Sequence, residues 1–414
     1  MSIGCLLVKH LEATKQTRRS PGPALARVLE EEHVPGPGDV LDLVRRGRAT
    51  TRGGILEVTG LSRMTVAQRV DALLEARLLI EDGTHGPTGG RRPRRLVVNS
   101  DHSRLVTATV NTTHTTTALA DLSGRILARD SFDVAVADGP ERTLHEVARS
   151  VRRLLAHPAA GGVPLAGVGV SIPGPVDPET GRPSQPPIMP GWDAYPIPDR
   201  LTDEFGVSVV VANDADAAAL GEQTVGYPDS PALCLVKVST GIGTGIVLDG
   251  RVYAGVDGGA GDIGHVRVTD DRQARCRCGA QGCLAAVAGG RAVALALSEL
   301  GIPASSGRDV GARLAAGDAD AARLTQEAGR RIGEVMATVV SVLNPGVVLL
   351  GGALASTPLL AGVRETLYPR SLPRATRHLT VALATLGDDA ASVGMARLLV
   401  ENEFSPAAVN ARLA

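Results

Sequence analysis

Residues 207–222 read Val-Ser-Val-Val-Val-Ala-Asn-Asp-Ala-Asp-Ala-Ala-Ala-Leu-Gly-Glu and place an apolar strand directly before an alanine-rich helix. The valines up to Val211 favour a strand, and the alanines after Asp214 favour a helix. Strands and helices alternate on both sides of this stretch, ending with a long helix at about 321–343 and a strand at 347–350. This alternation predicts an α/β fold with a predominantly parallel core.

The other expected elements of this region are short. Strands are expected at 105–110, 115–120, 125–132, 165–170, 233–238 and 245–248, and a helix at 141–155. The turn at 121–124 is typical of a hairpin. No short-period repeat is visible, which argues against a solenoid.

Length, cysteine content and charge exclude several classes of protein. A chain of 414 residues with five cysteines is expected to form two or three domains without disulfide staples. No apolar window is long enough to span a membrane and the first ten residues do not resemble a secretory leader, so we expect a cytoplasmic protein. Residues 1–100 carry 16 Arg and Lys against 11 Asp and Glu, which directs the search for a nucleic-acid module to this part.

The first hundred residues predict an arm followed by a winged helix-turn-helix. Residues 1–36 contain Pro-Gly punctuation and an acidic run, as in a flexible or partly helical N-terminal arm. Residues 37–98 then contain three short helical patterns and two strands, at 78–80 and 95–98. Ser62 is a suitable N-cap for the third helix, whose apolar residues recur at helical spacing.

The third helix also carries the side-chain types that reach phosphates and base edges, and these are Arg63, Thr65, Gln68 and Arg69. The loop between the two strands adds arginines on a glycine and proline scaffold suited to a minor groove, among them Arg91, Arg92 and Arg94. A solvated charge run would explain the loop alone, and a protein-binding winged helix would explain the helices alone. Together they favour double-stranded DNA, read as a palindromic operator by a two-fold symmetric assembly.

Four soft metal ligands lie within nineteen residues, and these are His265, Cys276, Cys278 and Cys283. Three thiolates and an imidazole form a complete ligand set for tetrahedral zinc, and Gly279 and Gly282 give the loop the freedom to fold around an ion. The alternative is a pair of structural thiols beside a loop histidine. We expect a structural Zn²⁺ site, since clustered thiols fit a reducing compartment.

Three further motifs have the residue types of a substrate or nucleotide site. Asp214 lies between a strand and a helix, where it could act as a general base or simply cap the helix. A glycine-rich turn could offer its N–H groups to a phosphate or form a tight hairpin, and it contains Thr240, Gly241 and Gly243. Gly351 and Gly352 follow another strand, where a nucleotide base could lie against the backbone.

In this order, and together with residues 171–177, 190–192 and the zinc string, these motifs resemble the ROK family of repressors and sugar kinases over about residues 37–400. The resemblance implies a two-lobed, actin-like ATPase fold in which sugar and nucleotide meet in a cleft beside the zinc. Residues 99–410 would form this effector and oligomerisation domain. The winged helix in front places the chain with the repressor branch, similar to xylose-responsive and N-acetylglucosamine-responsive regulators.

The resemblance also shows where the chain departs from the kinases. Their Asp-x-Gly-Gly-Thr phosphate loop falls on residues 109–113, Thr-Val-Asn-Thr-Thr, which lack the aspartate and both glycines. Side chains fill the space that a phosphate needs, and a magnesium-organising carboxylate is lost. We therefore expect no use of ATP and no enzymatic activity.

The positions that form the sugar pocket in the family are only partly kept in this chain. The resemblance assigns effector binding to Asn213, Asp214, Asp262 and His265, with Asp214 at the position of the family's catalytic base. His265 would bind zinc through one ring nitrogen and face the sugar pocket with the other. Asp216, Ile188 and Ala285 stand where Asn, Asn and Glu are usual. Each lost hydrogen-bonding partner of a sugar removes about 1–3 kcal/mol of binding energy.

The sequence thus predicts a ROK-type transcriptional regulator, a repressor of carbohydrate or secondary-metabolism genes, acting as a homodimer or homotetramer with a zinc-braced effector domain. Its ligand would be a sugar or a sugar phosphate. Two alternatives stay open. A sugar kinase with a DNA-binding module would use Asp214 and the glycine-rich turn, whereas a regulator without a sugar ligand would explain Ile188 and Ala285.

Overall fold

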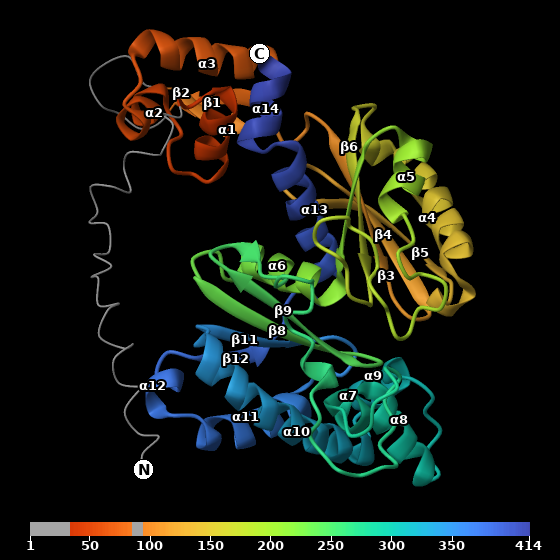
Figure 1. Cartoon of the computed structure of the whole chain (residues 1–414). Helices are drawn as coiled ribbons and strands as arrows, with labels where there is room; N and C mark the ends of the chain where they lie inside the picture. The colour runs from red at the N-terminus through yellow and green to blue at the C-terminus, as the bar shows by residue number, and fades with distance from the viewer. Residues whose placement is uncertain (1–33, 85–93) are drawn as a thin grey trace, which may run out of the picture.

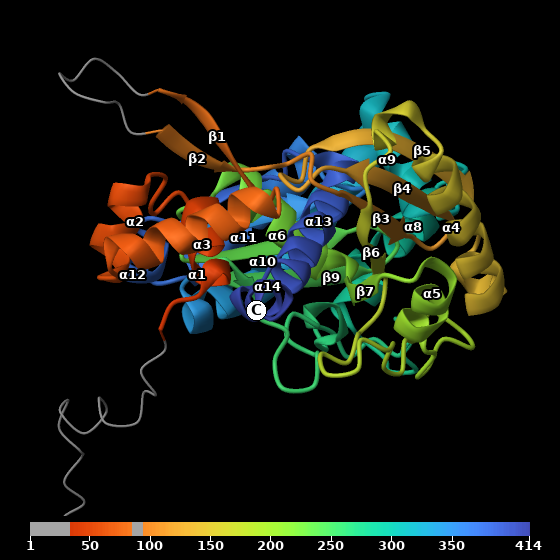
Figure 2. The same cartoon turned by 90° about the horizontal axis from the view of Figure 1, so that it is seen from above.

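The computed structural model describes residues 34–84 and 94–414 and contains a winged helix and two lobes (Figures 1 and 2). The expected arm falls almost wholly on residues 1–33, which lie outside the described part. Within the described residues, no helix combines the length and apolar character needed to cross a membrane.

The winged helix has the predicted composition. It consists of α1 (Pro37–Arg45), α2 (Arg52–Thr59), α3 (Arg63–Glu75), β1 (Leu79–Thr84) and β2 (Arg94–Val98). Ser62 caps α3 as predicted, because its hydroxyl accepts a hydrogen bond from the backbone N–H of Thr65 at 3.1 Å. Strands β1 and β2 pair antiparallel, and the tip of the wing between them lies outside the described residues.

The first lobe is built on a five-stranded sheet in the order β5-β4-β3-β6-β7. Its strands are β3 (Arg104–Val110), β4 (His114–Ala120), β5 (Ile126–Asp133), β6 (Leu165–Ile172) and β7 (Ser208–Asn213). Helices α4 (Pro140–Leu155) and α5 (Ile197–Phe205) pack on one face. Short 3-10 turns lie at η1 (Val136–Asp138) and η2 (Pro158–Ala160).

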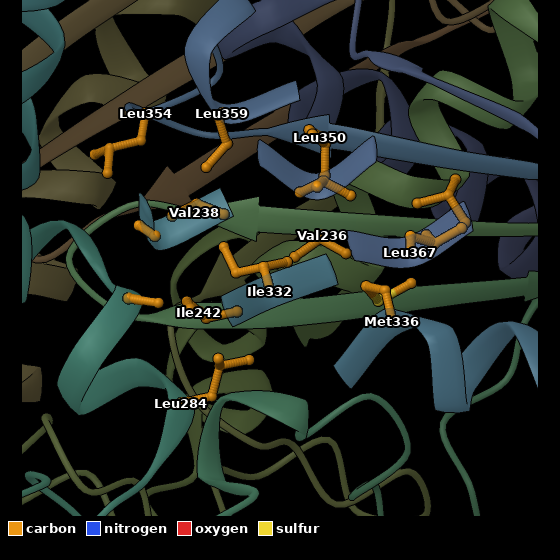
Figure 3. Packing of buried hydrophobic residues seen from close by; sticks show 14 of the residues in the cluster. Val236, Val238, Ile242, Leu284, Ile332, Met336, Leu350, Leu354, Leu359 and Leu367 are labelled. Carbon is orange, nitrogen blue, oxygen red and sulfur yellow. The ribbon is translucent and has the colours of Figure 1, made fainter. Parts of the chain in front are cut away.

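The second lobe repeats this topology in the order β10-β9-β8-β11-β12. Its strands are β8 (Ala232–Val238), β9 (Ile242–Leu248), β10 (Arg251–Val252), β11 (Val347–Gly351) and β12 (Thr380–Leu383). Its helices are α7 (Leu284–Ala288), α8 (Gly290–Glu299), α9 (Gly307–Ala315), α10 (Ala319–Leu343), α11 (Thr357–Arg370) and α12 (Pro373–Thr376). Side chains from β8, β11, α10 and α11 interdigitate in its core, among them Val236, Leu350, Ile332 and Leu367 (Figure 3).

The prediction of a predominantly parallel core was wrong. In each lobe the first three strands are antiparallel, and only the last two strands join them in parallel pairing. The short turns between β3, β4 and β5 leave no room for a crossover helix, and such a turn forces neighbouring strands to run in opposite directions.

The two lobes exchange one helix each. Helix α6 (Asp214–Gly226) follows β7 of the first lobe but covers a face of the second sheet, and α13 (Ala390–Glu403) follows β12 and η4 (Gly387–Asp389) but covers the first sheet. They cross at Gly221 and Gly394, where an added Cβ would lie 2.0 Å from the carbonyl oxygen of Ala390 and 1.8 Å from that of Ala217, respectively. The crossing thus depends on the absence of two side chains.

A buried carboxylate fixes the same junction. Glu222 on α6 is fully buried and accepts hydrogen bonds from the backbone N–H groups of Thr385 and Leu386 at 2.7 and 2.6 Å. Its second oxygen accepts from the Thr385 hydroxyl at 2.9 Å. Helix α6 is therefore tied to the segment that leads into α13.

The C-terminal helix, which the sequence did not place, packs on the winged helix. Helix α14 (Pro406–Leu413) lies against α1, and the Asn410 side chain accepts from the Gly38 N–H at 2.7 Å (Figure 1). Val409 and Phe404 share one apolar core with Leu41 of α1 and Leu399 of α13. The winged helix is thus packed continuously onto the helix that covers the first lobe.

We expect Gly221→Ala to lower the free energy of unfolding by about 1–3 kcal/mol, because the new methyl group meets a backbone carbonyl that cannot turn away. Gly226→Ala is the matched control at the exposed end of α6, where an added Cβ meets nothing within 4 Å. Urea unfolding of both variants measures the effect. Equal midpoints for the two variants would show that the crossing is not closely packed.

Candidate functional site

The four predicted metal ligands converge. His265 ends the turn η3 (Ile263–His265), Cys276 and Cys278 lie in the following loop, and Cys283 precedes α7. Their ligand atoms all lie within 4.8 Å of one another. The distance from Cys276 Sγ to His265 Nδ1 is 3.6 Å and that between the Sγ atoms of Cys278 and Cys283 is 3.8 Å. Bonds of about 2.3 Å to a tetrahedral ion give edges of about 3.7 Å, so these residues can hold one metal ion.

The loop backbone explains how the ligands come together. Gly282 has a φ of +75°, and a Cβ there would lie 1.9 Å from the carbonyl oxygen of Thr269. The N–H of Cys276 donates to the Ala280 carbonyl at 2.9 Å, which closes the tight turn that carries two of the thiols. Gly279 lies within this turn with a φ of +90° and Gly282 follows it, so glycines allow the loop to fold around the cluster, as predicted.

A cavity of about 490 Å³ opens beside the metal cluster. Its lining includes Ser184 and Gln185 from the first lobe and Asp257, Asp262, His265 and Arg277 from the second. His265 thus belongs to both features, since its Nδ1 faces Cys276 while the residue lines the cavity. Of the four predicted effector residues, the cavity brings together Asp262 and His265, whereas Asn213 and Asp214 are not among its lining residues.

Asp214 is held by a lysine that the sequence analysis missed. Its Oδ2 lies 2.5 Å from Nζ of Lys237, and the two side chains are only 12% and 15% exposed. Asp214 follows the last strand of the first lobe and Lys237 lies on β8, so this ion pair joins the lobes. The sequence does mark Lys237 as unusual, because it is one of only three lysines in the chain and it interrupts an otherwise apolar strand.

Asn213, and not Asp214, caps α6. Its Oδ1 accepts from the N–H groups of Ala215 and Asp216 at 2.8 and 3.3 Å, and its Nδ2 donates to the Gly174 carbonyl at 3.0 Å. The predicted sugar-binding amide is therefore occupied by backbone partners. Ile188 and Ala285, at the altered sugar positions, pack against the apolar cores of the first and second lobes.

The glycine-rich loops meet but are packed against protein. The segment with Thr240 and Gly241 is the tight β8–β9 hairpin, and Gly243 lies in β9. Gly352, with a φ of +88°, precedes Ala353, whose N–H donates to Ser239 Oγ at 3.2 Å, so the Gly351–Gly352 loop adjoins this hairpin. At the hairpin tip, Thr240 Oγ1 lies 3.2 Å from Thr112 Oγ1 of the β3–β4 turn. The two turns, one from each lobe, are thus in contact.

The predicted DNA-contacting residues differ in their exposure and in whether other side chains already bind them. Arg63 and Gln68 are exposed on α3 and have no hydrogen-bond or ion-pair partner among the described residues. Arg69 is half-buried with one unpaired nitrogen, Thr65 contacts the Ser62 hydroxyl, and Arg94 pairs with Glu81. Arg91 and Arg92 lie outside the described residues.

The fold and the site define a class of two-lobed proteins with sheets of repeated topology, a metal-ligand cluster and an N-terminal winged helix. A model of the ROK family matches residues 108–402, and the chain belongs to the ROK family. A glucokinase from Halalkalibacterium halodurans is 33% identical over 58% of this chain and 78% of its own length. The xylose repressor of Bacillus subtilis is 25% identical over 88% of this chain and 94% of its own.

A solved structure matches the whole architecture. The crystal structure of a ROK family transcriptional regulator, described as a homologue of the E. coli MLC protein, covers 91% of this chain and 98% of its own with a TM-score of 0.75 at 25% identity. A Streptomyces griseus ROK glucokinase solved with glucose and AMPPNP covers 72% of this chain with a TM-score of 0.61 at 27% identity. The regulator therefore matches more of the chain than this kinase does.

Asp216, beside Asp214 on α6, is a buried acid without a full set of partners. It is 7% exposed, and its Oδ1 accepts no hydrogen bond among the described residues. Burial, and after it the charge of Asp214, raises the pKa of Asp216 from its ordinary value of 3.8 to about 7. The folded protein therefore takes up a proton at this carboxyl at a pH where the unfolded chain has lost it.

This raised pKa predicts a pH-dependent loss of stability. Between about pH 4 and pH 7 the folded state binds more protons at Asp216 than the unfolded state, so its contribution to stability falls as pH rises through this window. We expect Asp216→Asn to be about 2–4 kcal/mol more stable than the wild type at pH 8, and the difference to vanish near pH 4. Chemical unfolding at several pH values measures it, with the exposed Asp203→Asn as control. A difference independent of pH would contradict the raised pKa.

Proposed function

We propose that this protein is a transcriptional repressor whose winged helix binds operator DNA and whose ROK domain senses a ligand without phosphorylating it. The observation that carries the proposal is the exposed face of α3, where Arg63 and Gln68 are unpaired while Arg45, Arg46 and Arg52 of the same module form ion pairs. Donors left free on a recognition helix suit base edges and phosphates. The relatives named as xylose repressors align over 88% of the chain.

Two contacts argue against a kinase. A general base directs a lone pair at the hydroxyl it deprotonates, and one of the two carboxylate oxygens of Asp214, Oδ2, instead accepts a hydrogen bond from Lys237. The contact between Thr112 and Thr240 fills the space between the two turns that would flank a phosphate in the family kinases. The glucokinase relative keeps the kinase as the second candidate, and Asp214 is the residue that would serve it.

The cavity beside the metal cluster is the proposed effector site. It offers carboxylates, an amide, a hydroxyl and a guanidinium, which can hydrogen-bond a sugar or a sugar phosphate. Because it is lined by both lobes, a ligand that binds one interlobe angle better than another would shift that angle. The change would pass through the α6–α13 crossing to α14 and α1. A homodimer or homotetramer would present two winged helices to a palindromic site.

We propose that Zn²⁺ occupies the four-ligand cluster as a structural brace, since all four positions are filled by protein side chains and none is left for a substrate. It would fix the loop that supplies His265 and Arg277 to the cavity.

Selection of duplexes from a random library by the full chain tests the main proposal. We expect a palindromic site, and a loss of affinity of about 5- to 150-fold in Arg63→Ala and Gln68→Ala because each removes a base or phosphate contact. Arg251→Ala, an exposed and unpaired arginine on β10, serves as the control and should bind normally. Failure to select any duplex, together with sugar-dependent ATP turnover that Asp214→Ala abolishes, would favour the kinase.

Elemental analysis tests the metal. We expect one zinc per chain, lost in Cys278→Ser together with a fall in melting temperature, because the remaining three ligands leave the ion open to chelators. Cys234→Ala, a buried thiol in the core of the second lobe, should keep its zinc. A purified chain that folds fully and holds no zinc would contradict the metal site and favour thiols that pack in the loop without an ion.

A further inference from the structure

The first turn of α3 exposes an apolar side chain whose role neither the fold nor the proposed function explains. Met64 is 83% exposed, more than Val58 at 48% and Ile80 at 45%, the other large apolar residues exposed on the α1–α3 and β1–β2 module. Leaving a methionine in water forgoes about 1.5–3 kcal/mol of burial. Scattered apolar residues are common on surfaces, so position decides whether this one has a role.

The position of Met64 is that of a base-contacting residue. It is the second residue of α3, two residues after the Ser62 cap, and the N-terminal residues of a recognition helix are those that reach base edges. Gln68 lies one helical turn further on the same face, with its amide unpaired. Arg63 stands beside Met64 with a free guanidinium, so an apolar group is set among hydrogen-bond donors.

The charge of this face also fits DNA. Asp71 lies two turns beyond Met64, where a free carboxylate would repel phosphates. Its Oδ1 is held by Arg52 at 2.7 Å, so the ion pair neutralises this acid. No other acidic residue lies on α3 between Arg63 and Asp71.

We propose that Met64 reads the 5-methyl group of a thymine in the operator, on the same half-site as the base contacted by Gln68, whose amide suits adenine. The 5-methyl group of thymine is the apolar group that unmodified DNA presents in its major groove, and an exposed thioether chain matches it in size and polarity. This inference rests on the proposed function, because it requires that α3 enters the major groove.

The test replaces single thymines by deoxyuridine in the duplex selected by the full chain, which removes one methyl group and leaves every hydrogen-bonding group in place. We expect one thymine per half-site at which the exchange weakens wild-type binding about three- to fivefold, the equivalent of one buried methyl group. Met64→Ala should bind the thymine and uracil duplexes equally, while Met64→Leu, which keeps an apolar side chain, should still distinguish them.

Val58→Ala is the control, since it shortens an exposed apolar side chain on α2 and should keep the full sensitivity to uracil. Uracil sensitivity that is absent, or that persists unchanged in Met64→Ala, would overturn the inference. Such a chain would still bind its operator, whereas a chain that selects no DNA would contradict the proposed function itself.

Discussion

The structure depends on the crossing of α6 and α13. Each helix begins at the end of one sheet and covers the other, so neither lobe has a complete core without a helix supplied by its partner lobe. The backbones approach so closely at Gly221 and Gly394 that no side chain fits between them. Buried Glu222 then satisfies the N–H groups of the segment that enters α13, which fixes where that helix starts. A closely packed contact of this kind compresses little and transmits a displacement of one helix to the other.

This crossing connects the two ends of the molecule. The cavity lies between loops of both lobes, and α13 leads from the crossing into α14, which packs on α1 of the winged helix (Figure 2). The apolar core that holds the winged helix includes Ala396 and Leu399 of α13. A change in the angle between the lobes therefore has a continuous packed route to α3, which is the physical requirement for coupling two sites through a two-state element.

The sequence predicted well the local structure and the grouping of His265 with three cysteines, because both depend on patterns within short segments. Ser62, the helical stripe of α3 and the ligands from His265 to Cys283 are separated by few residues, so spacing alone describes them. It did not predict that Asn410 bonds to Gly38 or that Lys237 reaches Asp214, since each contact joins segments that are adjacent only after both lobes have folded. The antiparallel half of each sheet was not predicted. The order of strands and helices along the chain does not specify which strands pair or in which direction.

The ion pair between Lys237 and Asp214 ties the end of the first sheet to the second sheet. The lysine ammonium and the aspartate carboxylate are largely removed from water, and the contact of Thr112 with Thr240 joins the lobes at a second place. Removing either partner of such a pair leaves the other charge unpaired in a low dielectric, so the two side chains depend on each other. Both contacts join side chains of the protein itself, so a change in the angle between the lobes has to rearrange them.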